Sequence, residues 1–333
     1  MGENGAGKST VSIHLSVALL CIGKKVGVID LDVRQRSLTR YLENRTRWMQ
    51  NTSAKLSMPE IVRVDASQER DLDKAEAEES ERFLASLARL KRECDFIIID
   101  APGGDTFLSR LAHMYADTLI TPLNDSFVDF DLLGDVNPQT LEVLRPSFYS
   151  EMVWTCRKKK AQTSRRPIDW VVMRNRMSPL AARNKERVGG ALENLSKRIG
   201  FRLAPGLSER VIYRELFPAG LTLLDLSETS SNVAFTMSHK AARQELRDLV
   251  IVTPGRRRDQ HVDVRAIGTV SIGEDPVSRS LDVATMCFAI GKRMLTDEVH
   301  FDRLVGHGGE IAGFRQHAGL DRQQIAKDAR QRH

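Results

Sequence analysis

The chain has 333 residues, of which 41% are hydrophobic and 28% charged, a composition that is typical of globular proteins and excludes disorder throughout. Its formal net charge is +6, but it has no run of about 18 apolar residues and no basic segment before an apolar core. A membrane span and an export signal are therefore not expected. The cysteines lack the paired spacing of metal ligands, which favours free thiols over disulfides or a zinc site. They are Cys21, Cys94, Cys156 and Cys287.

The first elements in chain order are a helix and a strand. Residues 11–22 are apolar almost all round and end before Gly23, which suits a helix C-cap. Residues 25–32, KVGVIDLD, predict a short buried parallel strand that ends in carboxylates. An acidic stretch without a clear pattern follows, up to about residue 80.

Helix and strand patterns then alternate. Residues 81–94 place apolar side chains at helical spacing, and residues 96–100, 117–123 and 170–175 are short apolar runs that predict strands. This alternation predicts an α/β fold, with a doubly wound, mostly parallel sheet covered by helices on both faces.

A phosphate-binding motif stands at the start of the chain. Residues 2–9, GENGAGKS, satisfy G-x-x-x-x-G-K-[ST]. In such a loop the backbone N–H groups surround the phosphates, Lys8 reaches the β and γ oxygens, and the Ser9 hydroxyl ligates Mg²⁺. The helix that follows adds the positive end of its dipole, whereas a glycine-rich turn without a ligand is the alternative. The expected nucleotide contacts are Gly5, Ala6, Gly7, Lys8, Ser9 and Thr10.

Carboxylates close two of the predicted strands. Asp100 ends FIIID, where a carboxylate typically holds the Mg²⁺ shell, although an Asp that caps the next helix is the alternative. Asp30 and Asp32 end the other strand, and because they are two residues apart they point to the same side of it. Both therefore have the position to face the phosphates. We predict that Asp32 positions the attacking water.

Two features depart from a simple phosphate-loop fold. No strand precedes the loop, although one normally does, so the predicted sheet lacks its first strand and the true start is expected upstream. The tail after about residue 251 holds five of the eight histidines, nine of the 22 glycines, and neither Trp nor Tyr. We therefore predict a nucleotide-binding domain over residues 1–250 and an extension of uncertain structure over residues 251–333.

The loop, the strand ending in VIDLD and the segment FIIIDAPGG resemble the ParA/MinD ATPases, whose loop is a deviant Walker A motif. Within that superfamily, IDLDVRQRS, NDSFVDFDLLG, DWVVMRNR and ERVIYRELFPAGLTLLDL resemble the MipZ family, so the resemblance covers residues 2–249. It implies an ATPase that binds ATP and Mg²⁺ and then forms a face-to-face homodimer. It also implies that Asp32 and Lys8 serve catalysis and that Asn175 recognises the adenine, for which an amide is well suited.

The resemblance further implies a cytoplasmic, nucleoid-associated switch. Its ATP-bound dimers would bind DNA nonspecifically, contact ParB and position the division site by inhibiting FtsZ polymerisation. These partners follow by analogy, because the sequence itself shows no partner surface. Membrane binding is not expected, since the final residues, LDRQQIAKDARQRH, contain too few large apolar side chains. A nonhydrolysing nucleotide-binding module and a metabolic enzyme on the same scaffold remain the alternatives.

Glu3 is a departure from the family pattern. The family usually carries a second lysine early in the loop, K-G-G-x-G-K-[ST], which reaches the phosphate of the partner protomer. Glu3 stands at this position, and a carboxylate repels a triphosphate. This repulsion opposes dimer-coupled hydrolysis, whereas binding through Lys8 within one protomer does not depend on the second lysine.

A basic region follows in the second half of the chain. Residues 145–214 contain 17 Lys or Arg against 5 Asp or Glu, whereas residues 65–95 contain ten acidic and six basic residues. Ser178 and Pro179 predict the start of a helix whose apolar stripe lies opposite a basic face. Such a face can bind the phosphates of DNA without recognising its bases. The alternative is a basic helix face that is only exposed to solvent and binds no partner. The stripe is Val188, Leu192, Leu195 and Ile199. The candidate DNA-binding residues are Arg183, Arg187 and Arg198 on the basic face, and Arg210, which lies downstream of the helix and would add to it.

Overall fold

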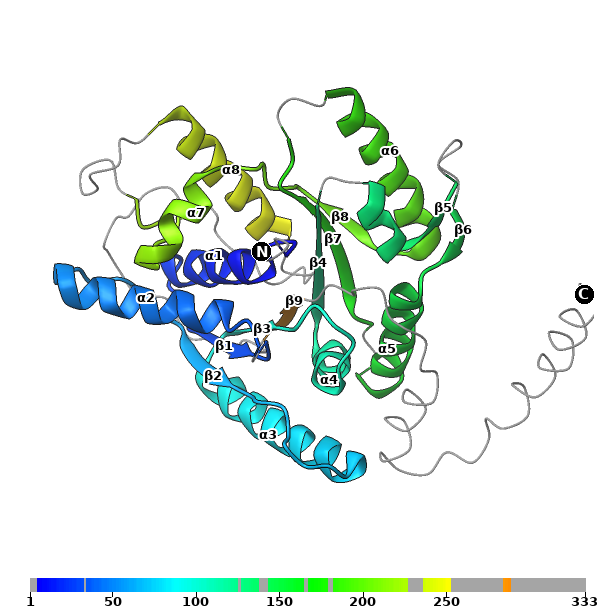
Figure 1. The fold of residues 1–333 in the computed structure, drawn as a ribbon, viewed down its shortest axis with the longest axis horizontal. Coiled ribbons are helices and arrows are strands. Elements are labelled where there is room, and N and C mark those ends of the chain that lie inside the picture. Colours follow the sequence, from blue (N-terminus) through cyan, green and yellow to red (C-terminus); the bar gives the residue numbers. More distant parts are fainter. Residues whose placement is uncertain are drawn as a thin grey trace, which may run out of the picture. The chain divides into compact units, whose positions relative to one another are not determined.

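The computed structural model describes residues 5–32, 34–124, 127–137, 143–164, 167–178, 182–226, 236–252 and 284–288. These residues form a seven-stranded sheet in which all neighbouring strands are parallel, in the order β2-β1-β3-β9-β4-β7-β8 (Figure 1). The strands are β1 (Val26–Asp30), β2 (Glu60–Arg63), β3 (Phe96–Asp100), β4 (Thr118–Asn124), β7 (Asp169–Asn175), β8 (Arg202–Ala204) and β9 (Ala284–Phe288). A small antiparallel ribbon, β5 (Gly134–Val136) with β6 (Val143–Pro146), stands apart from the sheet.

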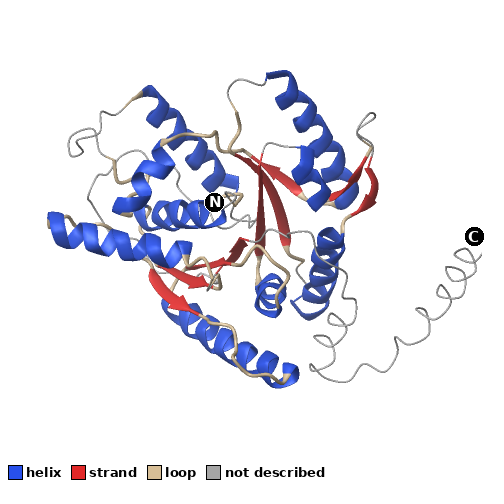
Figure 2. Ribbon diagram, in the orientation of Figure 1, coloured by secondary structure: helices blue, strands red, loops and turns tan. Residues whose placement is uncertain are grey.

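Helices cover both faces of the sheet, as the alternating pattern predicted (Figure 2). Helices α1 and α8 pack together on one face, and α3, α4 and α5 follow one another on the other. The helices are α1 (Lys8–Cys21), α2 (Ser37–Thr52), α3 (Leu72–Glu93), α4 (Phe107–Tyr115), α5 (Phe148–Ser164), α6 (Ala182–Ile199), α7 (Ile212–Leu216) and α8 (Met237–Val252), with the 3₁₀ turns η1 (Phe127–Leu132) and η2 (Phe217–Ala219). The doubly wound, mostly parallel α/β fold is therefore confirmed.

The central strands are buried because helices lie on both sides of them. Every residue of β1 and β3 is buried, which explains why VGVID and FIIID are continuous apolar runs rather than alternating ones. Gly27 in β1 allows α3 to approach closely, because a Cβ at this position would lie 2.9 Å from a methyl group of Leu90. On the opposite face, residues 11–19 of α1 are all buried. This core holds the loop that precedes α1 against the ends of β1 and β3.

Three elements lie in the stretch where the sequence shows no clear pattern. Helix α2 and strand β2 occupy it, and α3 begins at Leu72 rather than near residue 81. The N-terminal end of α3 has a recognisable cap, because the Asp71 carboxylate accepts a hydrogen bond from the Lys74 N–H at 3.0 Å. The acidic side chains in this first part of α3 are at least partly exposed, and they mask its helical periodicity.

The strand β9 comes from the tail of the chain. It lies between β3 and β4, with Asp100 opposite Phe288 and Leu119 opposite Cys287. The sequence predicted a sheet that lacks its first strand and a tail of uncertain structure. The structure places a short piece of that tail in the sheet, next to the strand that carries Asp100.

A buried ion pair fastens α2 to the segment after η2. The Arg45 side chain is 0% exposed, and its Nη1 and Nη2 atoms each lie 2.7 Å from an oxygen of Asp225. Arg45 also donates to the carbonyls of Ser57 and Gly220, both at 3.0 Å. Burial alone would raise the pKa of Asp225, but the hydrogen bonds and charge of Arg45 lower it. The carboxylate therefore stays ionised inside the protein.

Replacing Arg45 by Ala should lower the free energy of unfolding by about 3 to 5 kcal/mol, because it leaves the Asp225 carboxylate buried without its partner. Urea denaturation of the purified chain measures this decrease. The matched control is Arg36→Ala, at the start of the same helix. Its pair with Glu43 is 46% and 51% exposed, and such a pair contributes less than about 1 kcal/mol. Equal decreases in the two variants would contradict the anchoring role of Arg45.

Candidate nucleotide-binding site

The loop before α1 is shaped by Gly7. This residue has a φ of +82° and stands at the N-cap of α1, and its carbonyl accepts the Val11 N–H at 2.9 Å. A Cβ on Gly7 would lie 2.3 Å from Nδ2 of Asn175, so both the backbone angle and the space require glycine. The free N–H groups of the first turn of α1 are the donors that a phosphate requires. Glu3 lies outside the described residues.

Asp100 lies directly beside the predicted magnesium ligand Ser9. The Ser9 hydroxyl donates to Oδ2 of Asp100 at 2.6 Å, and the Ser12 hydroxyl lies 3.3 Å from Oδ1. Asp100 is 1% exposed. Burial raises its pKa to about 7, and the charges of Asp30 and Asp32 act in the same direction, against the Ser9 bond and the charge of Lys8. The structure therefore brings together the two side chains that the sequence assigned to magnesium.

This pair of oxygens fits Mg²⁺. The ion prefers oxygen ligands and is commonly held by one or two protein groups together with phosphate oxygens and water. A cation beside Asp100 would also offset the cost of ionising a buried carboxylate. The described residues contain no group of three His, Cys, Asp or Glu side chains able to hold a metal. Magnesium at Ser9 and Asp100 would thus take its remaining ligands from the nucleotide and water.

The Lys8 amine lies against the loop that follows β3. A Cβ placed on Gly103 would be 3.2 Å from the Nζ of Lys8, so this amine and the backbone of the loop are close neighbours. The loop itself is held at its far end by Arg110, whose Nε donates to Asp105 at 2.5 Å. A triphosphate between Lys8 and this loop would meet both the ammonium group and backbone groups of the loop.

Asp30 and Asp32 differ in their surroundings. Asp30 is 2% exposed, and its oxygens accept hydrogen bonds from the Thr39 hydroxyl at 2.5 Å and from the backbone N–H groups of Thr39 and Asp32 at 3.0 Å. Burial raises the pKa of Asp30, although these hydrogen bonds oppose the increase. Asp32 is half-buried, and among the described residues its carboxylate accepts a hydrogen bond from the Gln35 N–H at 3.2 Å. Asp30 thus holds the start of α2 through Thr39 and lies opposite Asp100 in the sheet, and the expectation that both carboxylates face the phosphates stays a prediction.

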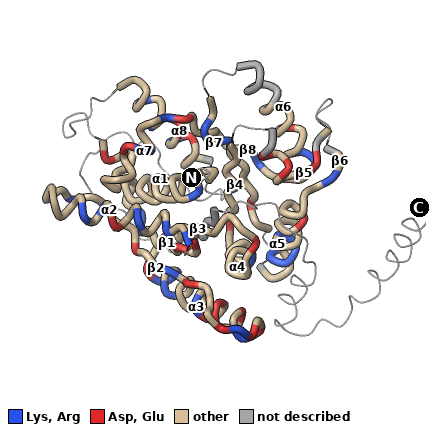
Figure 3. The backbone as a smooth tube through the Cα atoms, in the orientation of Figure 1, with Lys and Arg blue, Asp and Glu red and all other residues tan. Residues whose placement is uncertain are grey.

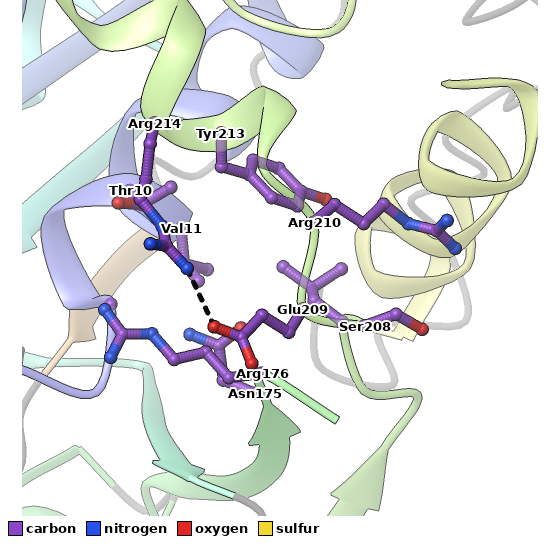
Figure 4. Close-up of a pocket in the computed structure, with 11 residues that line it drawn as sticks. Thr10, Val11, Asn175, Arg176, Ser208, Glu209, Arg210, Tyr213 and Arg214 are labelled. Atoms are coloured by element: carbon purple, nitrogen blue, oxygen red, sulfur yellow. Dashed lines mark hydrogen bonds and ion pairs between the residues drawn. The ribbon is translucent and has the colours of Figure 1, made fainter. Parts of the chain in front are cut away.

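A pocket opens beside the loop, between α1, the end of β7 and the segment 207–214 (Figure 4). Asn175 forms one wall, and its Nδ2 donates to the carbonyl of Ala6 at 2.6 Å. The exposed Arg214 side chain reaches Glu209 at 2.9 Å across the pocket. The side-chain amide of Asn175 thus already holds the phosphate loop, while its position beside the pocket suits the predicted contact with a base.

Tyr213 also lines this pocket, although no sequence motif assigned it to the site. Its hydroxyl is buried and has no hydrogen-bond partner among the described residues. Burial raises the pKa of this phenol well above its ordinary value, so the group remains a neutral donor and acceptor. Its ring packs edge-on against His14 of α1, with the centroids 5.1 Å apart. The segment 207–214 contains no recognisable nucleotide-binding motif. Its one sequence signal was that residues 209–216, ERVIYREL, resemble the MipZ family.

The candidate DNA-binding residues lie in two different places. The apolar stripe of α6 is buried as predicted, with each of its four members at most 2% exposed, and Arg198 near the helix end is exposed. Arg183 and Arg187 lie in α6, but their side chains are outside the described residues, as are residues 179–181 at the predicted helix start. Helix α6 itself begins at Ala182. Figure 3 marks further Lys and Arg positions in blue along the backbone of helix α5.

Arg210 is not part of the α6 face. It is 17% exposed and pairs with Glu245 of α8 at 2.7 Å, and its other terminal nitrogen donates to Ser238 at 2.8 Å. This arginine therefore ties the pocket wall to α8.

A glycine loop that leads into a buried helix, with Ser9 of that helix bonded to Asp100 at the carboxyl end of a parallel strand, defines a P-loop nucleoside triphosphatase fold. The family model "ATPase MipZ" matches residues 2–253. The chain therefore belongs to the MipZ family of ATPases, within the ParA/MinD superfamily.

Individual relatives match over shorter stretches. The chain is 32% identical over 117 residues to the septum site-determining protein MinD of Synechocystis sp., which covers 31% of this chain and 43% of MinD. For MinD of Helicobacter pylori the identity is 31% over 150 residues, or 39% and 54% of the two chains. The chain thus spans about half the length of the curated relatives it matches. The MinC:MinD cell division complex of Aquifex aeolicus aligns with a TM-score of 0.46 and 16% identity, over 87% of this chain and 96% of that chain.

No helix within the described part of the chain is both long and apolar enough to cross a membrane.

Replacing Asp100 by Asn should stabilise the ligand-free protein at about pH 8, by about 1 to 3 kcal/mol. In the folded state Asp100 keeps its proton up to a pKa of about 7, whereas the unfolded chain loses it near 3.8, so stability falls as the pH rises between these values. The Asp100→Asn variant has no carboxyl group to titrate at this position, so its folding stability should not fall over this pH range. It should also lose the additional stability that Mg·ATP gives to the unmodified chain. Denaturation midpoints at about pH 5 and pH 8, with and without Mg·ATP, measure both effects.

The control for this experiment is Asp131→Asn, an equal change at an exposed residue within η1, which should alter neither quantity. Retention of Mg·ATP stabilisation by the Asp100→Asn variant would contradict a role of this carboxylate at the magnesium site.

Proposed function

We propose that this chain is an ATP-driven switch that binds Mg·ATP at the loop 5–10 and hydrolyses it as a homodimer. The contact between Ser9 and Asp100 carries the proposal, because it joins the two predicted magnesium ligands at the N-terminus of α1. Membership of an ATPase family supports the reaction, and the ATP concentration that half-saturates the purified chain tests the binding. A folded chain without affinity for Mg·ATP would contradict the whole proposal.

Each residue of the proposed site has a separate task. The backbone of Gly5, Ala6 and Gly7 surrounds the phosphates, while Lys8 neutralises the β and γ oxygens. Thr10, at the start of α1, lines the pocket together with Asn175, which contacts the adenine. These side chains bind and orient the nucleotide.

Asp32 is assigned to the attacking water. It is half-buried and stands where β1 has ended, whereas the oxygens of Asp30 are already taken up by Thr39 and the Asp32 N–H. A carboxylate in this position orients a water molecule and accepts its proton as the bond to phosphorus forms.

The cellular part of the proposal follows the MipZ family. ATP-bound dimers would bind DNA nonspecifically through Arg183, Arg187 and Arg198 of α6, and hydrolysis would release them. Contact with ParB and inhibition of FtsZ polymerisation would place this cytoplasmic, nucleoid-associated protein in the positioning of the division site. Sedimentation of FtsZ polymers with and without the ATP-bound chain tests this part separately from nucleotide binding.

Glu3 favours a second candidate function, a nucleotide-binding module that does not hydrolyse ATP. A carboxylate at this loop position lacks the charge with which the family's second lysine meets the partner's triphosphate. Replacement of Glu3 by Lys separates the two functions. Turnover that appears only in this variant supports the module, whereas turnover in the unmodified chain supports the switch.

Replacing Asp32 by Ala should leave Mg·ATP affinity within about threefold and lower turnover about 100-fold or more, because only the positioning of water is removed. The trapped ATP state should then remain on DNA longer. Phosphate release and the rate of dissociation from immobilised DNA measure the two effects. Unchanged turnover would remove Asp32 from its assigned role.

Replacing Arg183 and Arg187 together by Ala should weaken DNA binding for all sequences alike. The slope of log affinity against log salt should fall by about one unit for each phosphate that the protein no longer neutralises. Fluorescence anisotropy with two unrelated duplexes at several salt concentrations measures this. Lys91→Ala with Arg92→Ala on α3 is the control, because it removes the same charge from exposed positions elsewhere. An equal decrease of affinity in the control would show a general charge effect instead of a site on α6.

A further inference from the structure

We infer that the tail of the chain supplies, through residues 284–288, the central strand on which assembly of the nucleotide site depends. These residues lie outside the part of the chain that the ATPase MipZ model matches, which ends at residue 253. The inference therefore assigns a structural role to a region in which the sequence shows no motif. Its second part, the effect of this strand on nucleotide binding, rests on the function proposed above.

The first argument is the position of β9 in the sheet. Strand β9 is parallel to both of its neighbours, with five residue pairs to β3 and three to β4. Neighbouring strands in a sheet are about 4.8 Å apart, so without β9 the strands β3 and β4 would stand about 10 Å apart. They would then be too distant to pair directly. Because β9 is the middle strand in the order of the sheet, this gap would fall in its centre.

The second argument is the burial of the two neighbours. Residues Ile97, Ile98 and Ile99 of β3 and Leu119 and Ile120 of β4 are all 0% exposed. Their backbone N–H and C=O groups have no access to water, and a buried backbone group without a partner costs about as much as a missing hydrogen bond. Strand β9 provides partners for both strands at once.

The third argument is the sequence of the segment. Residues 283–290, VATMCFAI, contain no charged residue and no Gly or Pro, although charged residues surround them on both sides. A strand in the middle of a parallel sheet is covered on both faces, and it therefore has to be short and uncharged. The composition of the segment agrees with the place that the structure gives it.

The link to the nucleotide site runs through Asp100. This residue is the last of β3 and lies opposite Phe288 of β9, and it holds Ser9 of α1 through a 2.6 Å hydrogen bond. Helix α1 lies against β9 as well as against β3. Without β9, the end of β3 that carries Asp100 would be paired only with β1. Helix α1 would also lose the part of the sheet against which it packs at β9. Magnesium and phosphate binding would weaken for this reason.

Hydrogen exchange on the unmodified full-length chain tests the strand directly. Backbone amides of residues 284–288 should exchange about 100-fold or more slowly than in an unstructured peptide, as in other central strands. The protected β1 serves as the internal reference. Exchange of residues 284–288 at the rate of an unstructured peptide, with β1 protected, would overturn the inference.

A proline variant tests the link to the site. Met286→Pro places proline in the middle of β9, although proline within sheets is tolerated essentially only at the edges. Amide hydrogen exchange at residues 96–100 and 118–120 should therefore become faster, and the affinity for Mg·ATP should fall about tenfold or more. Met286→Leu, which keeps the backbone N–H and an apolar side chain of similar size at the same position, is the matched control and should change neither. Global unfolding of the Met286→Pro variant alone also supports the inference. Unchanged exchange and affinity in that variant would overturn it.

The same experiments separate this inference from the proposed function. If residues 284–288 are protected but the unmodified chain binds no Mg·ATP, the strand assignment is supported and the proposed function is overturned. If the chain binds Mg·ATP while these residues exchange freely, the inference is overturned and the proposed function stands.

Discussion

A carboxylate buried at the end of a central strand sets the geometry of the nucleotide site. Asp100 is 1% exposed, so ionising its carboxyl group costs free energy unless a cation or a hydrogen-bond donor lies nearby. The Ser9 hydroxyl is such a donor, at 2.6 Å. That one bond fixes the first turn of α1 against β3. The glycine loop, the Lys8 amine and the pocket at Asn175 then take their positions relative to α1. A magnesium site at Asp100, as proposed, would therefore set ligand affinity against stability at this residue, as is common at functional sites.

The second constraint is that a parallel sheet leaves no backbone group in its interior without a partner. Strands β3 and β4 are buried on both faces, so a chain that carries them also has to provide what lies between them. Here the partner comes from residues 284–288, far along the sequence from the loop that they support. Such a long-range pairing closes a large loop, and the entropy cost of that closure has to be met before the contacts stabilise the sheet.

Much of the fold could be predicted from the sequence, because strands buried on both faces are continuous apolar runs and their ends carry carboxylates. Ser9 and Asp100 were paired correctly for the same reason: a fixed motif and a strand end leave little freedom. The bond of Asp30 to Thr39 was not foreseen, because it depends on where α2 begins, which no pattern revealed. Tyr213 and β9 were missed since each owes its role to a neighbour distant in sequence, and local periodicity carries no information about such contacts.

Helix α2 has a mechanical consequence for the site. Near its start, Thr39 is bonded to Asp30 beside the Asp32 loop, and further along Tyr41 and Arg45 are bonded to Leu221 and Asp225, just beyond the helix that carries Tyr213. A helix fastened in this way moves as a rod, because a packed core resists local deformation. If the chain hydrolyses ATP as proposed, displacement of the loop that carries Asp32 would tilt α2 and shift the wall of the pocket at Tyr213. A change at the phosphate end of the site would in this way reach the pocket.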